Sequence, residues 1–179
     1  YNLSVFSNPK SNLEQFGLGK GMKVADLGVG AGFYAIEAAR MVGPEGLVFC
    51  VDVQKELVAE VKKSAEREGF NNVEAIWGDI EKLEGTKIKE AGVDAVIASN
   101  ILFQVENKEG FIAEIVRILK PGGRALVIDW TDSFAGMGPH KDHVVTEDNA
   151  KNLFTANGFS IDRKIEAGDH HYGFVAKKM

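Results

Sequence analysis

The sequence has little of what would place it in several large classes of protein. It contains one cysteine in 179 residues, so an intramolecular disulfide is excluded. No uninterrupted apolar run approaches the length of a membrane span, and no leader-like segment is visible, so we expect no membrane partner. The formal net charge is −5, and the basic residues are scattered rather than gathered in a stripe, which argues against a nucleic-acid partner. These features agree with a protein of the reducing cytoplasm.

What is present indicates one globular domain spanning residues 1–179. Hydrophobic residues make up 45% of the chain and charged residues 26%, and this length allows a substantial core. We expect Cys50, inside an apolar segment, to be a buried structural thiol rather than a nucleophile. The chain begins with Tyr1 rather than Met, so its natural N-terminus is not established, and a homodimer stays open as one oligomeric state.

Short apolar segments alternate with amphipathic ones, which is typical of an α/β fold with parallel strands and helices on both faces. The predicted strands are 23–27, 47–51, 73–77, 93–98, 124–130, 159–165 and 172–177, and the predicted helices are 11–16, 32–42, 55–68, 108–119 and 146–157. A weaker helical pattern at 81–90 is interrupted by Gly85. The short connection before the last strand indicates an antiparallel hairpin.

The most informative stretch is the run from Asp26 to Gly32, in which glycines stand at every second position between a strand and a helix. Glycines there let the backbone turn sharply and let a ligand approach closely, and the amides at the helix start then face that ligand. Asp52 ends the next strand, where a carboxylate can accept two hydrogen bonds from a ribose diol. Two plainer interpretations stay open: the glycines form only a tight turn, or Asp52 caps the helix that begins near Lys55.

The spacing of this run selects among nucleoside cofactors. A dinucleotide fingerprint needs its third glycine one residue later, where this chain has Phe33. Asp26 precedes the first glycine, and an acid suits a cationic ligand better than a pyrophosphate. The run D-x-G-x-G-x-G resembles the first motif of class I S-adenosylmethionine-dependent methyltransferases.

The resemblance extends over nearly the whole chain and implies a Rossmann-like, seven-stranded, mostly parallel sheet whose last strand is antiparallel. It implies S-adenosylmethionine as cofactor, with Asp26 and the glycine loop on the methionine part, Asp52 on the ribose, and Asp79 with Ile80 on the adenine. Ser99-Asn100 resembles the fourth motif, and residues 120–123 resemble the turn before the fifth strand. The cofactor-binding residues expected from the resemblance are Asp26, Gly28, Gly30, Gly32, Phe33, Asp52, Val53, Gly78, Asp79, Ile80, Ser99 and Asn100.

Some of these residues also have purely structural interpretations. Asp79 can cap a helix beginning at Glu81, with or without an adenine contact. Asn100 can be a polar strand terminus. Phe33 and Trp130 are expected to pack against the sheet, whereas Phe134 and Met137 lie in a polar segment and are better candidates for a lid.

The long connection at 131–145 reads as a loop, and a loop of this length is often a functional lid. All four histidines fall in this late part of the chain: His140, His143, His170 and His171. In the resembled fold, all four would lie at the carboxyl edge of the sheet with the cofactor. One of them could act as a general base, two could bind a metal, or all could be solvated loop residues. The catalytic candidates are His140, His143 and Asp129, with His171 ranked below them, and no metal site is predicted.

The resemblance favours methyl transfer to a small molecule by in-line displacement. Ser99-Asn100-Ile101-Leu102 differs from the proline-proline-aromatic run of DNA and protein-glutamine N-methylating enzymes, and a single cysteine does not suit arsenite methylation. Asp129 alone is poor support for a catechol-type magnesium site. The late region resembles enzymes of the quinone-biosynthesis type loosely. The alternatives are a cofactor-binding module without turnover, an NAD-dependent oxidoreductase, and methylation of RNA or protein.

Overall fold

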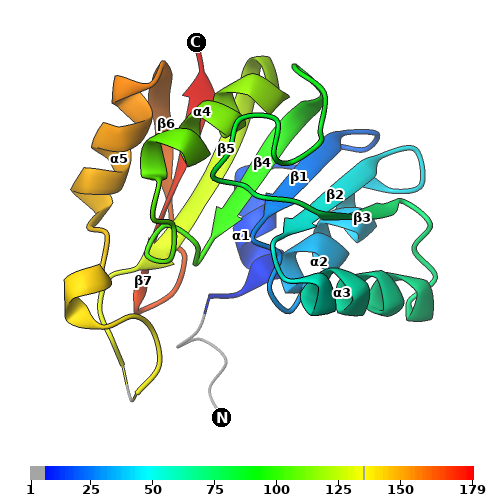
Figure 1. Cartoon of the computed structure of the whole chain (residues 1–179), viewed down its shortest axis with the longest axis horizontal. Coiled ribbons are helices and arrows are strands. Elements are labelled where there is room, and N and C mark those ends of the chain that lie inside the picture. Colours follow the sequence, from blue (N-terminus) through cyan, green and yellow to red (C-terminus); the bar gives the residue numbers. More distant parts are fainter. Residues whose placement is uncertain (1–6, 135) are drawn as a thin grey trace.

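The computed structural model describes residues 7–134 and 136–179, so residues 1–6 of the N-terminal segment (1–20) and residue 135 of the predicted lid loop lie outside the described part. Seven strands form one sheet in the order β3-β2-β1-β4-β5-β7-β6 (Figure 1). The elements are α1 (Pro9–Phe16), β1 (Lys23–Leu27), α2 (Phe33–Val42), β2 (Leu47–Asp52), α3 (Lys55–Arg67), β3 (Val73–Trp77), β4 (Val93–Ser99), α4 (Lys108–Ile118), β5 (Leu119–Trp130), a 3₁₀ turn (Lys141–His143), α5 (Glu147–Ala156), β6 (Phe159–Ile165) and β7 (His171–Lys178).

The sheet is parallel except at one strand. β1 pairs in parallel with β2 and β4, whereas β7 runs antiparallel between β5 and β6. This confirms the predicted α/β class, the parallel sheet and the antiparallel last strand. The chain order reverses between β1 and β4, and ligands of open α/β sheets bind at the carboxyl ends of the strands at such a point.

Two apolar layers cover the sheet because its central strands carry apolar side chains on both faces. Leu13 and Phe16 of α1 share one layer with residues of α2 and α3. Phe111 and Phe154, from α4 and α5, belong to the layer on the opposite face. Figure 1 shows this division. Cys50 is fully buried, as expected, within the first layer.

Two segments differ from the prediction. Residues 81–90 contain no helix, because the buried Glu114 carboxylate accepts hydrogen bonds from the amides of Glu84 and Thr86 and holds the segment as a series of turns. The turn expected at 120–123 lies inside β5 as a bulge, since Val93 pairs with Leu119 while Ala95 already pairs with Arg124. Hydrogen bonds to distant parts of the chain determine the conformation of both segments, and the local sequence pattern does not reveal such bonds.

The remaining boundaries agree with the prediction to within two residues. Thr146 caps α5, accepting a hydrogen bond from the Asn149 amide at 3.2 Å. α1 lies beside α2 and reaches the edge strand β6, where Arg163 donates to the Phe16 carbonyl at 3.0 Å. In the described residues, no helix combines the length and the apolar character that crossing a membrane requires.

Candidate functional site

The glycine loop joins β1 to α2 in a conformation that needs its glycines. Gly28 and Gly32 have φ of +76° and +82°. A Cβ on Gly28 would lie 2.5 Å from Ile101 Cδ1, and a Cβ on Gly32 would lie 2.7 Å from Val61 Cγ2. The loop therefore packs closely against α3 and against the segment after β4, and its backbone is open on the remaining side.

Two hollows meet at this loop. The α1 hollow, about 680 Å³, is bounded by the start of α1, the glycine loop and the end of β4. The β2–β3 hollow, about 200 Å³, lies over the ends of β2 and β3. Both are lined by Gly28, Gly30 and Gln104, so they form one cleft of two lobes. The predicted cofactor residues in the α1 hollow are Asp26, Gly28, Gly30, Gly32, Phe33, Ser99 and Asn100, and those in the β2–β3 hollow are Gly28, Gly30, Asp52, Val53, Asp79 and Ile80.

The α1 hollow contains a carboxylate whose hydrogen bonding is incomplete. Asp26 is 3% exposed, and its Oδ2 has no hydrogen-bond partner among the described residues. Burial, with a smaller contribution from the negative charge of Asp52, raises the pKa of Asp26 to about 8. The buried Ser99 Oγ and Asn100 Oδ1 also lack partners in the described part of the chain. A bound cation would both pair with Asp26 and reverse the pKa shift, so this hollow fits the ammonium of an amino-acid tail.

The two acids of the β2–β3 hollow are only partly occupied by protein contacts. Asp52 accepts hydrogen bonds from the amides of Gln54 at 2.9 Å and Gly30 at 3.4 Å. Gln54 is the N-cap residue of α3, so Asp52 does not cap that helix directly. Asp79 binds the Glu81 amide and Lys82, and the hydrogen bond from Lys82 lowers the pKa of Asp79. Because no helix begins at Glu81, the capping interpretation of Asp79 is wrong, and its side chain stays at the wall of the hollow.

Two predicted residues lie elsewhere than the sequence indicates, and one residue of the cleft was not predicted. Gly78 does not line either hollow; a Cβ there would lie 2.4 Å from the Gly85 carbonyl oxygen, so this glycine permits a close backbone contact. Phe33 is 72% exposed at the start of α2 instead of packing against the sheet. Gln104 was not predicted, because nothing in its local pattern distinguishes it from other loop residues. It donates to the Asn100 carbonyl at 3.1 Å.

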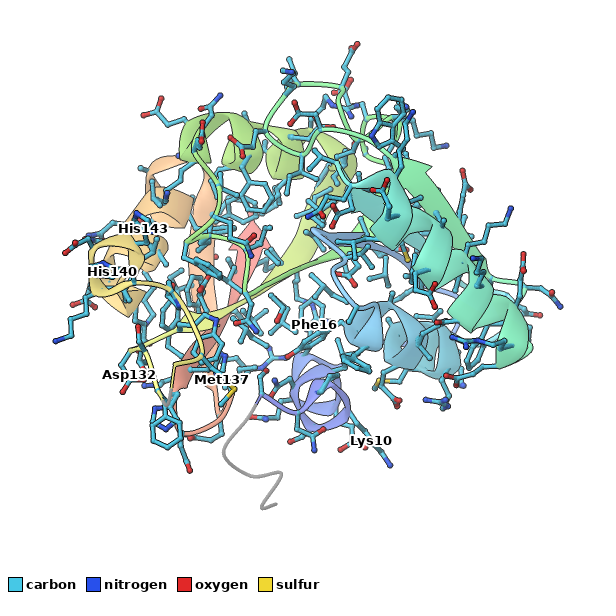
Figure 2. The ribbon with its side chains drawn as sticks, turned by 60° about the horizontal axis from the view of Figure 1, so that its bottom comes forward. Lys10, Phe16, Asp132, Met137, His140 and His143 are labelled. Carbon is cyan, nitrogen blue, oxygen red and sulfur yellow. The ribbon has the colours of Figure 1, made fainter. Side chains whose placement is uncertain are left out.

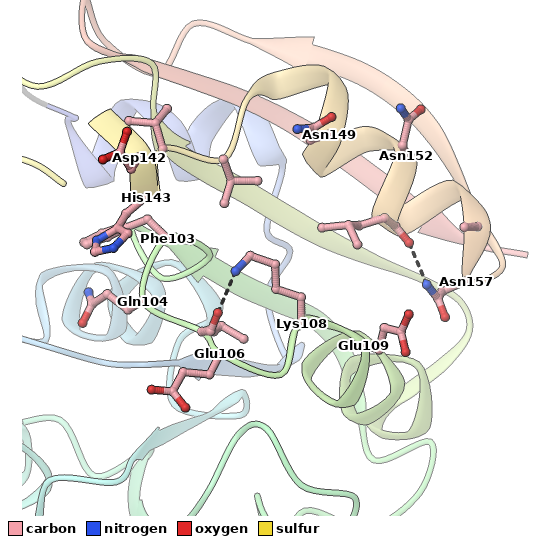
Figure 3. A pocket seen from close by; sticks show the side chains of 15 residues that line it. Phe103, Gln104, Glu106, Lys108, Glu109, Asp142, His143, Asn149, Asn152 and Asn157 are labelled. Carbon is pink, nitrogen blue, oxygen red and sulfur yellow. Dashed lines mark hydrogen bonds between the residues drawn. The ribbon is translucent and has the colours of Figure 1, made fainter. Parts of the chain in front are cut away.

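A third hollow, the α4–α5 groove, opens beside the cleft with a volume of about 940 Å³ (Figure 3). It shares Gln104 with both lobes of the cleft and Val105 with the β2–β3 hollow. His143 and Phe103 lie together at one end, and amide side chains of α5 line the other (Figure 3). Its lining residues are Phe103, Gln104, Val105, Glu106, Lys108, Glu109, Asp142, His143, Val144, Val145, Asn149, Asn152, Leu153, Ala156 and Asn157.

The structure separates the catalytic candidates. His140 and His143 are both exposed, but only His143 lines the groove, and His140 Nδ1 lies 3.2 Å from Asp142 Oδ2 (Figure 2). Asp129 is 1% exposed and accepts hydrogen bonds at 2.8 Å from the amides of Leu102 and Trp130. Burial raises the pKa of Asp129 to about 6. It does not line the cleft or the groove, and its carboxylate supports the loop after β4.

The other two histidines lie at the turn between β6 and β7. His170 pairs with Asp132 at 2.8 Å and stacks on Phe134, with 4.1 Å between the ring centroids. His171 is 7% exposed and packs on Trp130 with its centroid 4.3 Å away. Burial lowers the pKa of His171 to about 4, and neither ring nitrogen has a partner within the described residues. Those residues also contain no group of three or more His, Cys, Asp or Glu side chains that could hold a metal ion.

Comparison with known proteins gives a consistent result. A family model described as a methyltransferase domain matches residues 18–168. An arsenite methyltransferase of Halobacterium salinarum is 28% identical over 159 residues, which cover 89% of this chain and 39% of that protein. A ubiquinone/menaquinone biosynthesis C-methyltransferase of Pseudomonas entomophila is 31% identical over 120 residues, covering 66% of this chain and 46% of that protein. The chain thus spans less than half the length of these curated relatives.

A solved structure is similar over nearly its whole length. The crystal structure of an S-adenosylmethionine-dependent methyltransferase from Aquifex aeolicus has a TM-score of 0.89 and 29% identity, covering 99% of this chain and 92% of that one.

Proposed function

Because the chain belongs to the methyltransferase-domain family and uses S-adenosylmethionine as methyl donor, we propose that it methylates a small-molecule acceptor by in-line displacement. The observation that carries this proposal is the two-lobed cleft with an unpaired, buried carboxylate oxygen of Asp26 in one lobe. A cationic amino-acid tail fits that lobe, and a nucleoside fits the acids of the other. A pyrophosphate would place negative charge against Asp26, so this arrangement disfavours an NAD-dependent activity.

Each lobe has its own residues for the cofactor. Asp26, with Ser99 and Asn100, holds the amino-acid tail. Asp52 and Val53 hold the ribose, and Asp79 with Ile80 holds the adenine. When bound, S-adenosylmethionine supplies a methyl group already activated by its sulfonium. The protein then has to align the acceptor and exclude water, and such positioning gives effective molarities of about 10⁵ M or more.

We place the acceptor in the α4–α5 groove, at the end where Gln104 joins it to the cleft. His143 lines that end and is the preferred base for an acceptor that must lose a proton. His140 is the second candidate, because it caps the start of the same 3₁₀ turn. Asp129 is the third, because its carboxylate is already engaged by two amides. The connection at 131–145 carries the exposed Phe134 and Met137 and would act as the lid.

The single cysteine of the chain bears on whether the acceptor is arsenite or an organic compound. Trivalent arsenic is a soft centre that prefers thiolate ligands. Cys50 is fully buried, and burial with the nearby Asp26 charge raises the pKa of its thiol well above its usual value. An arsenite acceptor, as in the relative from Halobacterium, is therefore disfavoured. A small organic acceptor, as in the quinone-biosynthesis relatives, is supported better.

The test has two steps on the purified chain. Calorimetry with S-adenosylhomocysteine and with NAD should give binding of the first only. Incubation with methyl-labelled S-adenosylmethionine and a panel of small hydroxylated, amino and activated-carbon compounds should then give labelled product. Binding without product from any compound would favour a cofactor-binding module, and label in RNA or protein instead would move the proposal to a macromolecular acceptor.

A further inference from the structure

The α1 hollow has an evident partner for only one of the two charges on the cofactor's amino-acid tail. That tail carries an ammonium and a carboxylate, and Asp26 can pair only with the ammonium. A carboxylate in the same hollow calls for a cation or for backbone amides. The hollow is lined by two cationic side chains, Lys10 and Arg40.

Arg40 is already neutralised. Its guanidinium pairs with Glu37 and, at 2.9 Å, with Glu68, and it lies over the Phe70 ring at 5.4 Å from the centroid. Lys10 has no ion pair with any described residue. Lys10 is therefore the cation of this hollow that is free to meet a carboxylate.

The first turn of α1 is held firmly against α2, which fixes where Lys10 starts. The buried Asn12 side chain donates to the Tyr34 hydroxyl at 2.8 Å and to Ser7 Oγ at 2.9 Å. Ser7 Oγ and the Tyr34 hydroxyl are also hydrogen-bonded to each other at 2.6 Å. Asn8 accepts from the Ser11 amide at 3.1 Å and caps the helix. Lys10 thus extends from an anchored turn that lines the α1 hollow together with the glycine loop. Figure 2 shows its side chain projecting outward from α1.

We infer that Lys10 binds the carboxylate of the cofactor's methionine tail, opposite Asp26, so that the tail is held at both of its charges. The inference rests on the methyl donor of the proposed function and is independent of the acceptor. It adds to the glycine-loop site a residue of α1 whose local sequence carries no motif.

The test compares two donors that differ only in the carboxylate: S-adenosylmethionine and decarboxylated S-adenosylmethionine. In Lys10→Met, the dissociation constant of S-adenosylmethionine should rise by about threefold at low salt, as for an exposed ion pair. The affinity for the decarboxylated compound should not change. Lys20→Met is the matched control, because Lys20 is a lysine that does not line the α1 hollow but a neighbouring one near the other end of α2, and its replacement should change neither affinity.

The outcomes separate the two proposals. An unchanged affinity of Lys10→Met for S-adenosylmethionine overturns the inference and assigns the carboxylate to the amides at the start of α2. An equal loss for both compounds also overturns it, because it indicates a general effect on the hollow. Wild-type protein that binds neither compound overturns the proposed function as well.

Discussion

The cofactor cleft and the late region differ in how their residues are held. The cleft takes its groups from the ends of β1, β2 and β4 and from the start of α2, where strand pairing sets the backbone. The late region takes its groups from the connection after β5 and from the turn before β7. Its histidines separate: His143 lines the groove, His140 does not, and His170 and His171 pack on Phe134 and Trp130 at the β6–β7 turn.

This difference shows that the end of a paired strand fixes the position of a functional side chain. Asp26 lies next to the end of β1 and Asp52 ends β2, and these two strands pair in parallel, so the register places both carboxylates at one edge of the sheet. His140 and His143 follow a long connection whose course depends on its own packing. The binding residues of the cofactor cleft can therefore be inferred one by one from the strands that carry them. In the late region, each candidate residue has to be tested by substitution.

The largest effect should come from the buried acid of the cleft. Asp26→Asn removes one partner of a buried ion pair, which costs about 3–5 kcal/mol and corresponds to a weakening of cofactor binding of roughly a hundredfold to several thousandfold. Calorimetry with S-adenosylhomocysteine measures it. Asp129→Asn is the control, because this buried acid lies outside the cleft; an equal loss in both variants would contradict the role of Asp26.

The raised pKa of Asp26 adds a dependence on pH. The pKa of Asp26 is about 8 in the folded protein, above its ordinary value of 3.8, so between these pH values the folded protein binds more protons than the unfolded chain. This group therefore destabilises the ligand-free protein as pH rises from about 4 to about 8. A cationic ligand should expel the proton at pH 7, which titration in buffers of different ionisation enthalpy detects. Asp26→Asn should abolish the proton release.

The next effect tests the late region. His143→Ala should lower turnover by about a hundredfold if it is the general base, with the affinity for S-adenosylhomocysteine unchanged. His140→Ala tests the second candidate, and a smaller loss of turnover is expected because His140 does not line the groove. If both variants keep full turnover, neither histidine is the base, and Asp129, the third candidate, becomes the next residue to replace.

A smaller effect should distinguish two glycines of one loop. Both Gly28 and Gly30 have positive φ, but a Cβ on Gly28 would meet Ile101, whereas one on Gly30 has only the Gly28 carbonyl oxygen at 4.0 Å. Gly28→Ala should lower the free energy of unfolding by about 1–3 kcal/mol more than Gly30→Ala. Urea denaturation measures the difference. Equal losses would mean that backbone strain alone accounts for both.

The smallest effect concerns Trp77. Its indole Nε1 donates to the Val53 carbonyl at 2.9 Å, and Lys55 lies over its ring at 4.0 Å, so it holds the wall of the β2–β3 hollow. Trp77→Phe removes one hydrogen bond and should weaken S-adenosylhomocysteine binding by about threefold. Trp130→Phe is the control and leaves Trp77 as the sole tryptophan, whose emission should change on cofactor binding. Silent emission with unchanged affinity would remove Trp77 from this role.

Most of the fold follows from patterns that local physics enforces. Short apolar segments predict the strands, and the glycine loop predicts the cleft, because strand pairing and backbone freedom depend on those residue types. The segment at 81–90 escapes prediction, because a distant carboxylate, Glu114, determines its course. Gln104 escapes for a similar reason: its importance comes from three hollows meeting beside it, which only the folded chain brings about.

The buried position of Cys50 also makes the protein convenient to label. Thiol reagents have no access to the one native cysteine, because its side chain is enclosed by the apolar layer under α2. A cysteine introduced at the exposed Met137 would be the sole reactive thiol. A single dye attached there could report movement of the connection at 131–145 in an otherwise unaltered chain.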